Sequence, residues 1–207
     1  MSEAAGNRRL VLILLLLWLA VLIWSFIGAS RYFIWFAEAT PALGMVAVLI
    51  VTYKRFTFST LLYTLLFISL VWMLIGAHYT YERVPLFNWI RDELGQDRNH
   101  FDRIGHFLQG IIPALAVKEL AWRLNLVMHR NVRAIVALAF TLAVSGMYEI
   151  IEFLALLVFG GDANEFLGLQ GDEWDAQWDM IWAFCGGLTS ILLLDPLHDK
   201  QIRKLDR

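Results

Sequence analysis

Six long apolar segments constrain most strongly how this chain can fold. They make 59% of the residues hydrophobic and raise the mean hydropathy to +0.59. Each segment is close to the roughly 20 residues that an α-helix needs to cross the hydrocarbon core of a bilayer. The predicted spans are residues 10–30, 32–53, 56–78, 101–122, 133–159 and 174–195. The sequence therefore predicts an all-α, polytopic membrane protein, with a bundle of six transmembrane helices in a single domain over residues 1–207.

The distribution of basic residues predicts how these helices are oriented. If successive loops lie on alternate sides of the membrane, one side receives twelve of the 17 lysines and arginines. These twelve are Arg8, Arg9, Lys54, Arg55, Lys118, Arg123, Arg130, Arg133, Lys200, Arg203, Lys204 and Arg207. The positive-inside rule places this side in the cytoplasm, so both termini are expected there. The apolar run from Leu10 to Ile27 is longer than the core of a signal peptide, roughly 7–15 residues, so we interpret the first span as an uncleaved anchor.

The long outer loop after the third span contains the pattern of a short surface helix. Leu86, Ile90 and Leu94 recur at every fourth position. Pro85 suits the first turn of a helix, and Gly95 suits a C-terminal stop. We therefore expect a short helix lying in the outer interface, with a solvated loop as the alternative.

The length of the fourth span brings ionisable residues into the membrane. Its uncharged stretch, Phe107 to Val117, is far too short to cross a bilayer. The helix must therefore begin near Phe101 to reach the required length. Asp102 and His106 then lie in its first turns, four residues apart and on one face.

The last two predicted spans carry acidic residues with similar helical spacing. Glu149 and Glu152 lie on one face of the fifth span, and Asp175 and Asp179 lie on one face of the sixth. Because the fourth and sixth spans run inward and the fifth runs outward, these residues and Asp102 are expected together at the outer end. Five clustered carboxylates in a low dielectric cannot all stay ionised without cations. Ionisable groups in a membrane are functional by default, so we interpret this cluster as a site.

The residue types of this cluster predict its chemistry. Carboxylate and imidazole groups together suit a divalent metal ion such as Mn²⁺, Zn²⁺, Fe²⁺ or Mg²⁺. The predicted metal ligands are Asp102, His106, Glu149 and Asp179. Glu152 or Asp175 is the predicted general base, and Arg103 is predicted to orient an anionic group. In a favoured alternative, Arg98 and Arg103 neutralise the glutamates of the fifth span, because buried charges usually pair.

Three motifs stand out between residues 70 and 195. The first runs from Tyr81-Glu82-Arg83-Val84-Pro85 to Asp102-Arg103-Ile104-Gly105-His106-Phe107, the second is Tyr148-Glu149-x-x-Glu152, and the third is Gly171-Asp172-x-x-Asp175-x-x-x-Asp179. In this combination they resemble the YjdF-like inner-membrane proteins of bacteria. The resemblance implies a location in the bacterial inner (cytoplasmic) membrane and a multi-pass topology, but no reaction. A weaker similarity, to VanZ-like membrane proteins, rests on Asp179 and Gly186, with Ala183 in the place of that family's Asn.

The predicted site and location lead to three hypotheses for the function. The first is a metal-dependent enzyme that acts on a lipid-linked or amphiphilic substrate at the outer leaflet. The second is an ion- or proton-coupled transporter, and the third is a structural membrane protein whose polar cluster only fixes helix packing. The inner halves of the spans offer few polar groups for a path through the membrane, which favours an enzyme or a one-sided sensor over a transporter. The expected partners are the lipid bilayer and this substrate, and no nucleic acid is expected.

Overall fold

Helices make up all the regular structure in the described part of the chain. The computed structural model describes residues 3–126, 129–159 and 170–205. The helices are α1 (Glu3–Phe26), α2 (Tyr32–Thr52), α3 (Thr60–Tyr79), α4 (Pro85–Glu93), α5 (Phe101–Arg123), α6 (Arg130–Phe159), α8 (Asp175–Thr189) and α9 (Asp195–Leu205), with a π-helical turn, η2 (Ser190–Leu194), between the last two. This confirms the predicted all-α class.

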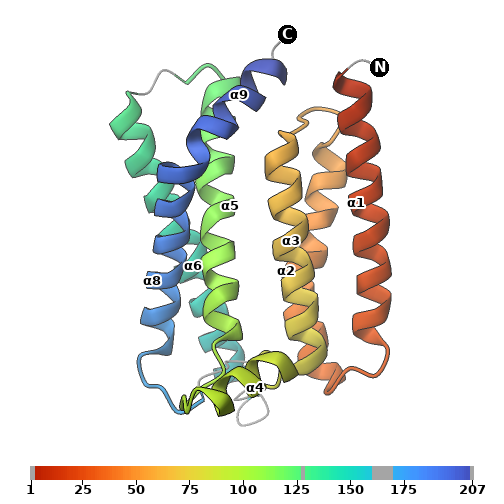
Figure 1. Cartoon of the computed structure of the whole chain (residues 1–207), viewed down its shortest axis with the longest axis vertical. Coiled ribbons are helices and arrows are strands. Elements are labelled where there is room, and N and C mark those ends of the chain that lie inside the picture. Colours follow the sequence, from red (N-terminus) through yellow and green to blue (C-terminus); the bar gives the residue numbers. More distant parts are fainter. Residues whose placement is uncertain (1–2, 127–128, 160–169, 206–207) are drawn as a thin grey trace.

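Five helical stretches among the described residues are long and apolar enough to cross a membrane. They are Asn7–Phe26, Tyr32–Thr52, Thr60–Tyr79, Arg130–Val158 and Asp175–Lys204. α5 has 23 residues, enough to span a bilayer, but charged residues at both of its ends make it less apolar. It packs against α3, α6 and α8 and runs alongside them in Figure 1. The polytopic membrane architecture is confirmed, and α5 as a sixth span stays a prediction.

Local chemistry explains where two of the helices depart from their predicted bounds. α1 ends at Phe26 rather than at residue 30, because Gly28 takes a left-handed conformation (φ +70°) that stops the helix. α3 begins at Thr60 rather than at residue 56. The side chain of Ser59 caps it by accepting a hydrogen bond from the backbone N–H of Leu62, at 3.3 Å.

The short helix that the sequence predicted in the outer loop is α4. Pro85 occupies its first turn, and Gly95 (φ +59°) follows its end. Its inward contact is Phe87, whose ring packs against Trp72 of α3 and Phe101 of α5. In Figure 1, α4 lies across the end of the bundle opposite the start of α1 and the whole of α9. It therefore covers the end at which α5 begins.

A buried polar network holds the opposite end of the bundle together. Glu119, fully buried near the end of α5, accepts a hydrogen bond from the backbone N–H of Ser59 at 2.8 Å. Its second oxygen lies 3.0 Å from Nε2 of His198 in α9. The neighbouring Lys118 pairs with Asp195 at 2.6 Å and with Asp199 at 2.8 Å. These contacts tie α9 to α3 and α5, and they give Lys118 and Glu119 partners within the bundle.

The orientation of the chain in the membrane stays a prediction that reporter fusions can test. Fusions after Arg55, after Arg130 and at the C-terminus should be active only as cytoplasmic reporters, because basic residues cluster at that end. A fusion near Asp97 should be active only as an external reporter. An external C-terminus would contradict the prediction, since the acidic residues of α8 would then face the cytoplasm.

Candidate functional site

Two glycines bring α5 and α8 into backbone contact, and this contact positions the predicted site. A Cβ atom on Gly110 would lie 1.9 Å from the carbonyl oxygen of Ala183. A Cβ atom on Gly186 would lie 2.0 Å from the carbonyl oxygen of Phe107. Small residues allow membrane helices to approach this closely. The acidic faces of the two helices are therefore held next to each other.

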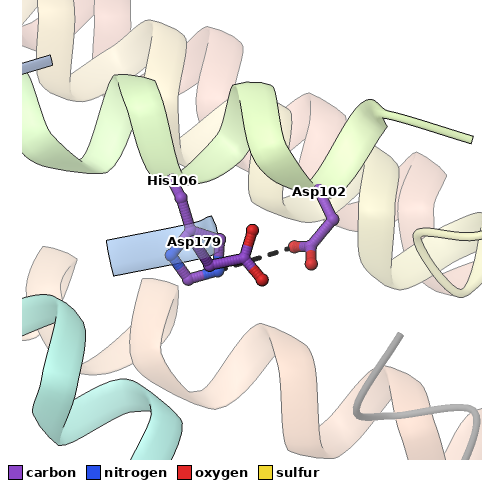
Figure 2. A group of neighbouring side chains, drawn as sticks. All are labelled: Asp102, His106 and Asp179. Carbon is purple, nitrogen blue, oxygen red and sulfur yellow. Dashed lines mark ion pairs between the residues drawn. The ribbon is translucent and has the colours of Figure 1, made fainter. Parts of the chain in front are cut away.

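Asp102 and His106 of α5 meet Asp179 of α8 in one cluster (Figure 2). One potential ligand atom from each of the three residues lies within 4.8 Å of the other two. Nε2 of His106 is 3.7 Å from an oxygen of Asp102, and it is also 3.7 Å from an oxygen of Glu149 in α6. His106 and Asp179 are only 4% and 2% exposed. The structure thus brings three of the four predicted metal ligands together and places the fourth, Glu149, beside His106.

The cluster has the chemistry, and nearly the spacing, of a divalent metal site. Bonds from Zn²⁺ to oxygen or nitrogen are about 2.1 Å long, so two ligand atoms lie at most about 4.2 Å apart. Small side-chain rotations would close separations of up to 4.8 Å to this value. Within the described part of the chain, Oε1 of Glu149 and Oδ1 of Asp179 are buried and have no hydrogen-bond partner. Buried polar atoms are usually satisfied, and a cation held by the cluster would satisfy the oxygen of Asp179.

The arginines near the cluster pair with aspartates at the start of α8. Arg98 hydrogen-bonds to Asp175, and the two side chains are 8% and 3% exposed. Nη2 of Arg103 lies 2.7 Å from Asp172, and its guanidinium lies 5.5 Å from the ring centre of Trp178. The favoured interpretation of Arg103, as the neutralising partner of a glutamate of the fifth span, is therefore corrected. The turn that precedes α8 presents an aspartate to it instead.

A cavity of about 400 Å³ adjoins the cluster between α2, α3, α5 and α6. Its polar lining is Glu38, Ser69, Tyr81, Asp102, His106, Gln109, Tyr148 and Glu152, and the other lining residues are mainly apolar or aromatic. Of the two predicted general bases, Glu152 lines this cavity, whereas Asp175 is engaged with Arg98. The candidate metal ligands Asp102 and His106 are therefore accessible from the same space as Glu152.

From the sequence, five of the eight polar residues that line the cavity were not assigned to the site: Glu38, Ser69, Tyr81, Gln109 and Tyr148. Glu38 is the single charged residue of its predicted span, so the cost of burying charge in a membrane could have identified it. Tyr81 follows α3 in a left-handed conformation (φ 43°), and its ring lies where a side chain on Gly76 would be. Burial raises the pKa of Tyr81 well above its usual value, so its phenol remains a hydrogen-bond donor.

Comparison with known proteins gives two consistent matches. The model of the family described as "Predicted membrane protein (DUF2238)" matches residues 10–200. Inner membrane protein YjdF of Escherichia coli (strain K12) is 40% identical over 184 residues, which cover 89% of this chain and 88% of that protein. No solved structure matches. The resemblance that the three sequence motifs indicated is thereby confirmed.

Proposed function

We propose that this chain, which belongs to the DUF2238 family of predicted membrane proteins, is a metal-dependent enzyme whose site lies in the outer half of the bilayer. One observation carries the proposal: Asp102, His106 and Asp179 place ligand atoms within 4.8 Å of one another. Ionisable groups this deeply buried are costly unless they bind a cation, share protons or pair. Their oxygen and nitrogen atoms are ligands that Zn²⁺, Mn²⁺ and Fe²⁺ accept.

Each residue of the site then has a role that follows from its surroundings. Asp102, His106 and Asp179 would hold the ion, with Glu149 as the nearest fourth ligand. A bound divalent ion would polarise a carbonyl oxygen of the substrate. Glu152 faces the cavity and would take a proton there as general base.

Arg103 and Asp175 receive a positioning role in this proposal instead of direct contact with the substrate. Arg103 holds Asp172 and Arg98 holds Asp175, so the two ion pairs fix the first turn of α8 and the turn before it against the start of α5. Asp179 lies one turn further along α8. Its position relative to His106 therefore depends on these two pairs.

A lipid-linked or amphiphilic substrate fits this site better than a small polar one. The cavity meets the polar cluster at one side and is lined mostly by apolar side chains elsewhere. The similarity to YjdF supports a bacterial inner membrane as the location, and the basic residues support cytoplasmic termini. A transporter would need polar groups that continue through the bundle. At the other end of α5 the charged side chains of Lys118 and Glu119 are already paired with α9, which supports the enzyme over the transporter.

Metal analysis of the purified protein tests the proposal. We expect a divalent metal to copurify, and Mn²⁺ or Zn²⁺ to raise the free energy of unfolding by about 2.7 kcal/mol when the free ion is about 100-fold above its dissociation constant. Asp179→Asn should abolish this gain, whereas Asp97→Asn, the same change at an exposed loop position, should preserve it. If no metal copurifies and Mn²⁺, Zn²⁺ and Mg²⁺ all leave the stability unchanged, the metal site is refuted and a protonated packing cluster explains the residues.

A further inference from the structure

We propose that the cavity between α2 and α6 binds a single-chain amphiphile with a cationic amine headgroup, and that Glu38 is the residue that receives this headgroup. The inference rests on the proposed function, because it names the substrate class of the same site. It goes further by adding a binding residue from α2, a helix that contributes nothing to the metal cluster.

Glu38 has the features of a binding residue whose partner comes from outside the chain. It is 1% exposed, it lines the cavity, and neither of its carboxylate oxygens has a hydrogen-bond partner among the described residues. A buried acceptor without a partner costs about 1–3 kcal/mol, and more if it is charged. A donor group entering the cavity would remove that cost.

The charge of the lining selects the kind of headgroup. Among the described residues, the lining of the cavity has three carboxylates, from Glu38, Asp102 and Glu152, and no lysine or arginine. A phosphate or carboxylate headgroup would meet like charge there, whereas an ammonium group would find acceptors. Trp72, Tyr81 and Tyr148 also line the cavity, and aromatic rings attract cations to their faces.

The rest of the cavity suits a hydrocarbon chain. Its volume of about 400 Å³ lies in the range of ligand sites, roughly 300–1,000 Å³. Away from the carboxylates it is lined by residues such as Leu66, Leu70, Met73, Ile112 and Val144. A headgroup at Glu38 would thus leave its alkyl tail among aliphatic side chains.

The entrance faces the bilayer rather than water. Met45 of α2 and Phe140, Met147 and Ile151 of α6 line the cavity but are 43%, 50%, 57% and 52% exposed. α2 packs on α3, while α6 packs on α5 and α8, and these exposed side chains line the cavity where it lies between α2 and α6. Methionine side chains are flexible and adapt to a passing chain. A lipid-soluble amine can therefore enter sideways from the membrane.

Retention of radiolabelled hexadecylamine by the full-length protein in phosphatidylcholine nanodiscs tests the inference. We expect specific retention of the amine and none of hexadecanoate. Glu38→Gln should weaken amine retention at least about tenfold, the effect of losing one charge-assisted hydrogen bond. Glu93→Gln, the same change at an exposed position of α4, should have no effect. Val144→Trp, which fills the apolar part of the cavity, should also abolish retention while Glu38 stays in place.

The outcomes separate this inference from the proposed metal site. Asp179→Asn should lose the stabilisation by metal and still retain the amine. Glu38→Gln should keep the stabilisation by metal and lose the amine. Wild-type amine retention by both Glu38→Gln and Val144→Trp would overturn the inference and leave the metal site standing. Equal retention of hexadecanoate and hexadecylamine would overturn the assignment of a cationic headgroup. If metal no longer stabilises the protein but amine retention is unchanged, only the proposed metal enzyme is contradicted.

Discussion

Gly110→Ala should destabilise the protein by about 1–3 kcal/mol or more, although it adds only one methyl group. The added Cβ would lie 1.9 Å from the carbonyl oxygen of Ala183, a backbone atom that can move only if α5 and α8 separate. Separation would draw His106 away from Asp179, so the stabilisation by metal should fall as well. Thermal unfolding in detergent micelles, with and without Zn²⁺, measures both effects.

Gly44→Ala is the matched control for this substitution. Gly44 also lies inside a membrane helix, α2, but a Cβ atom there would meet nothing within 4 Å. Because alanine restricts the unfolded chain and favours the helix, this change should stabilise by about 0.4–1 kcal/mol. If the Gly110 and Gly44 variants unfold at the same temperature, the backbone contact of α5 and α8 does not support the site.

Arg98→Met should destabilise the protein by about 3–5 kcal/mol, because it leaves Asp175 buried without its partner. Both side chains of this pair are almost fully buried, and the pair joins the segment before α5 to the first turn of α8. Denaturant unfolding in micelles, followed by helical circular dichroism, would measure the loss.

The double variant Arg98→Met with Asp175→Leu distinguishes a lost ion pair from lost packing. Replacing both members of a buried pair with apolar residues is often neutral, so most of the stability should return. If the double variant is less stable than Arg98→Met alone, the loss comes from packing around Arg98 and not from an uncompensated Asp175.

The length and period of the apolar segments were enough to predict most of the helices and part of the site. Both patterns are local, since a helix interior depends on residues within a few turns. Asp102 and His106 share a face because they are four residues apart, and the same rule aligned Asp175 with Asp179. The short helix α4 was predicted from Pro85 and from the spacing of Leu86, Ile90 and Leu94.

What the sequence could not predict depends on contacts between distant segments. Arg98 and Asp175 are 77 positions apart in the sequence, and no local pattern indicates that they pair. Glu38 lines the cavity only because α2, α3, α5 and α6 are arranged around it. The contact of Gly110 with Ala183 likewise depends on how α5 and α8 lie against each other.

The π-helical turn η2 limits how this chain can change in evolution. A π turn holds one residue more than an α turn, and one residue is about 100° of helix rotation. The turn lets one continuous span present Gly186 to the backbone of α5 and, further on, His198 to Glu119. Losing or gaining a residue in this stretch would rotate one of the two faces away from α5. We therefore expect relatives to keep its length fixed, while Leu192 and Leu193, 70% and 71% exposed, vary among apolar residues.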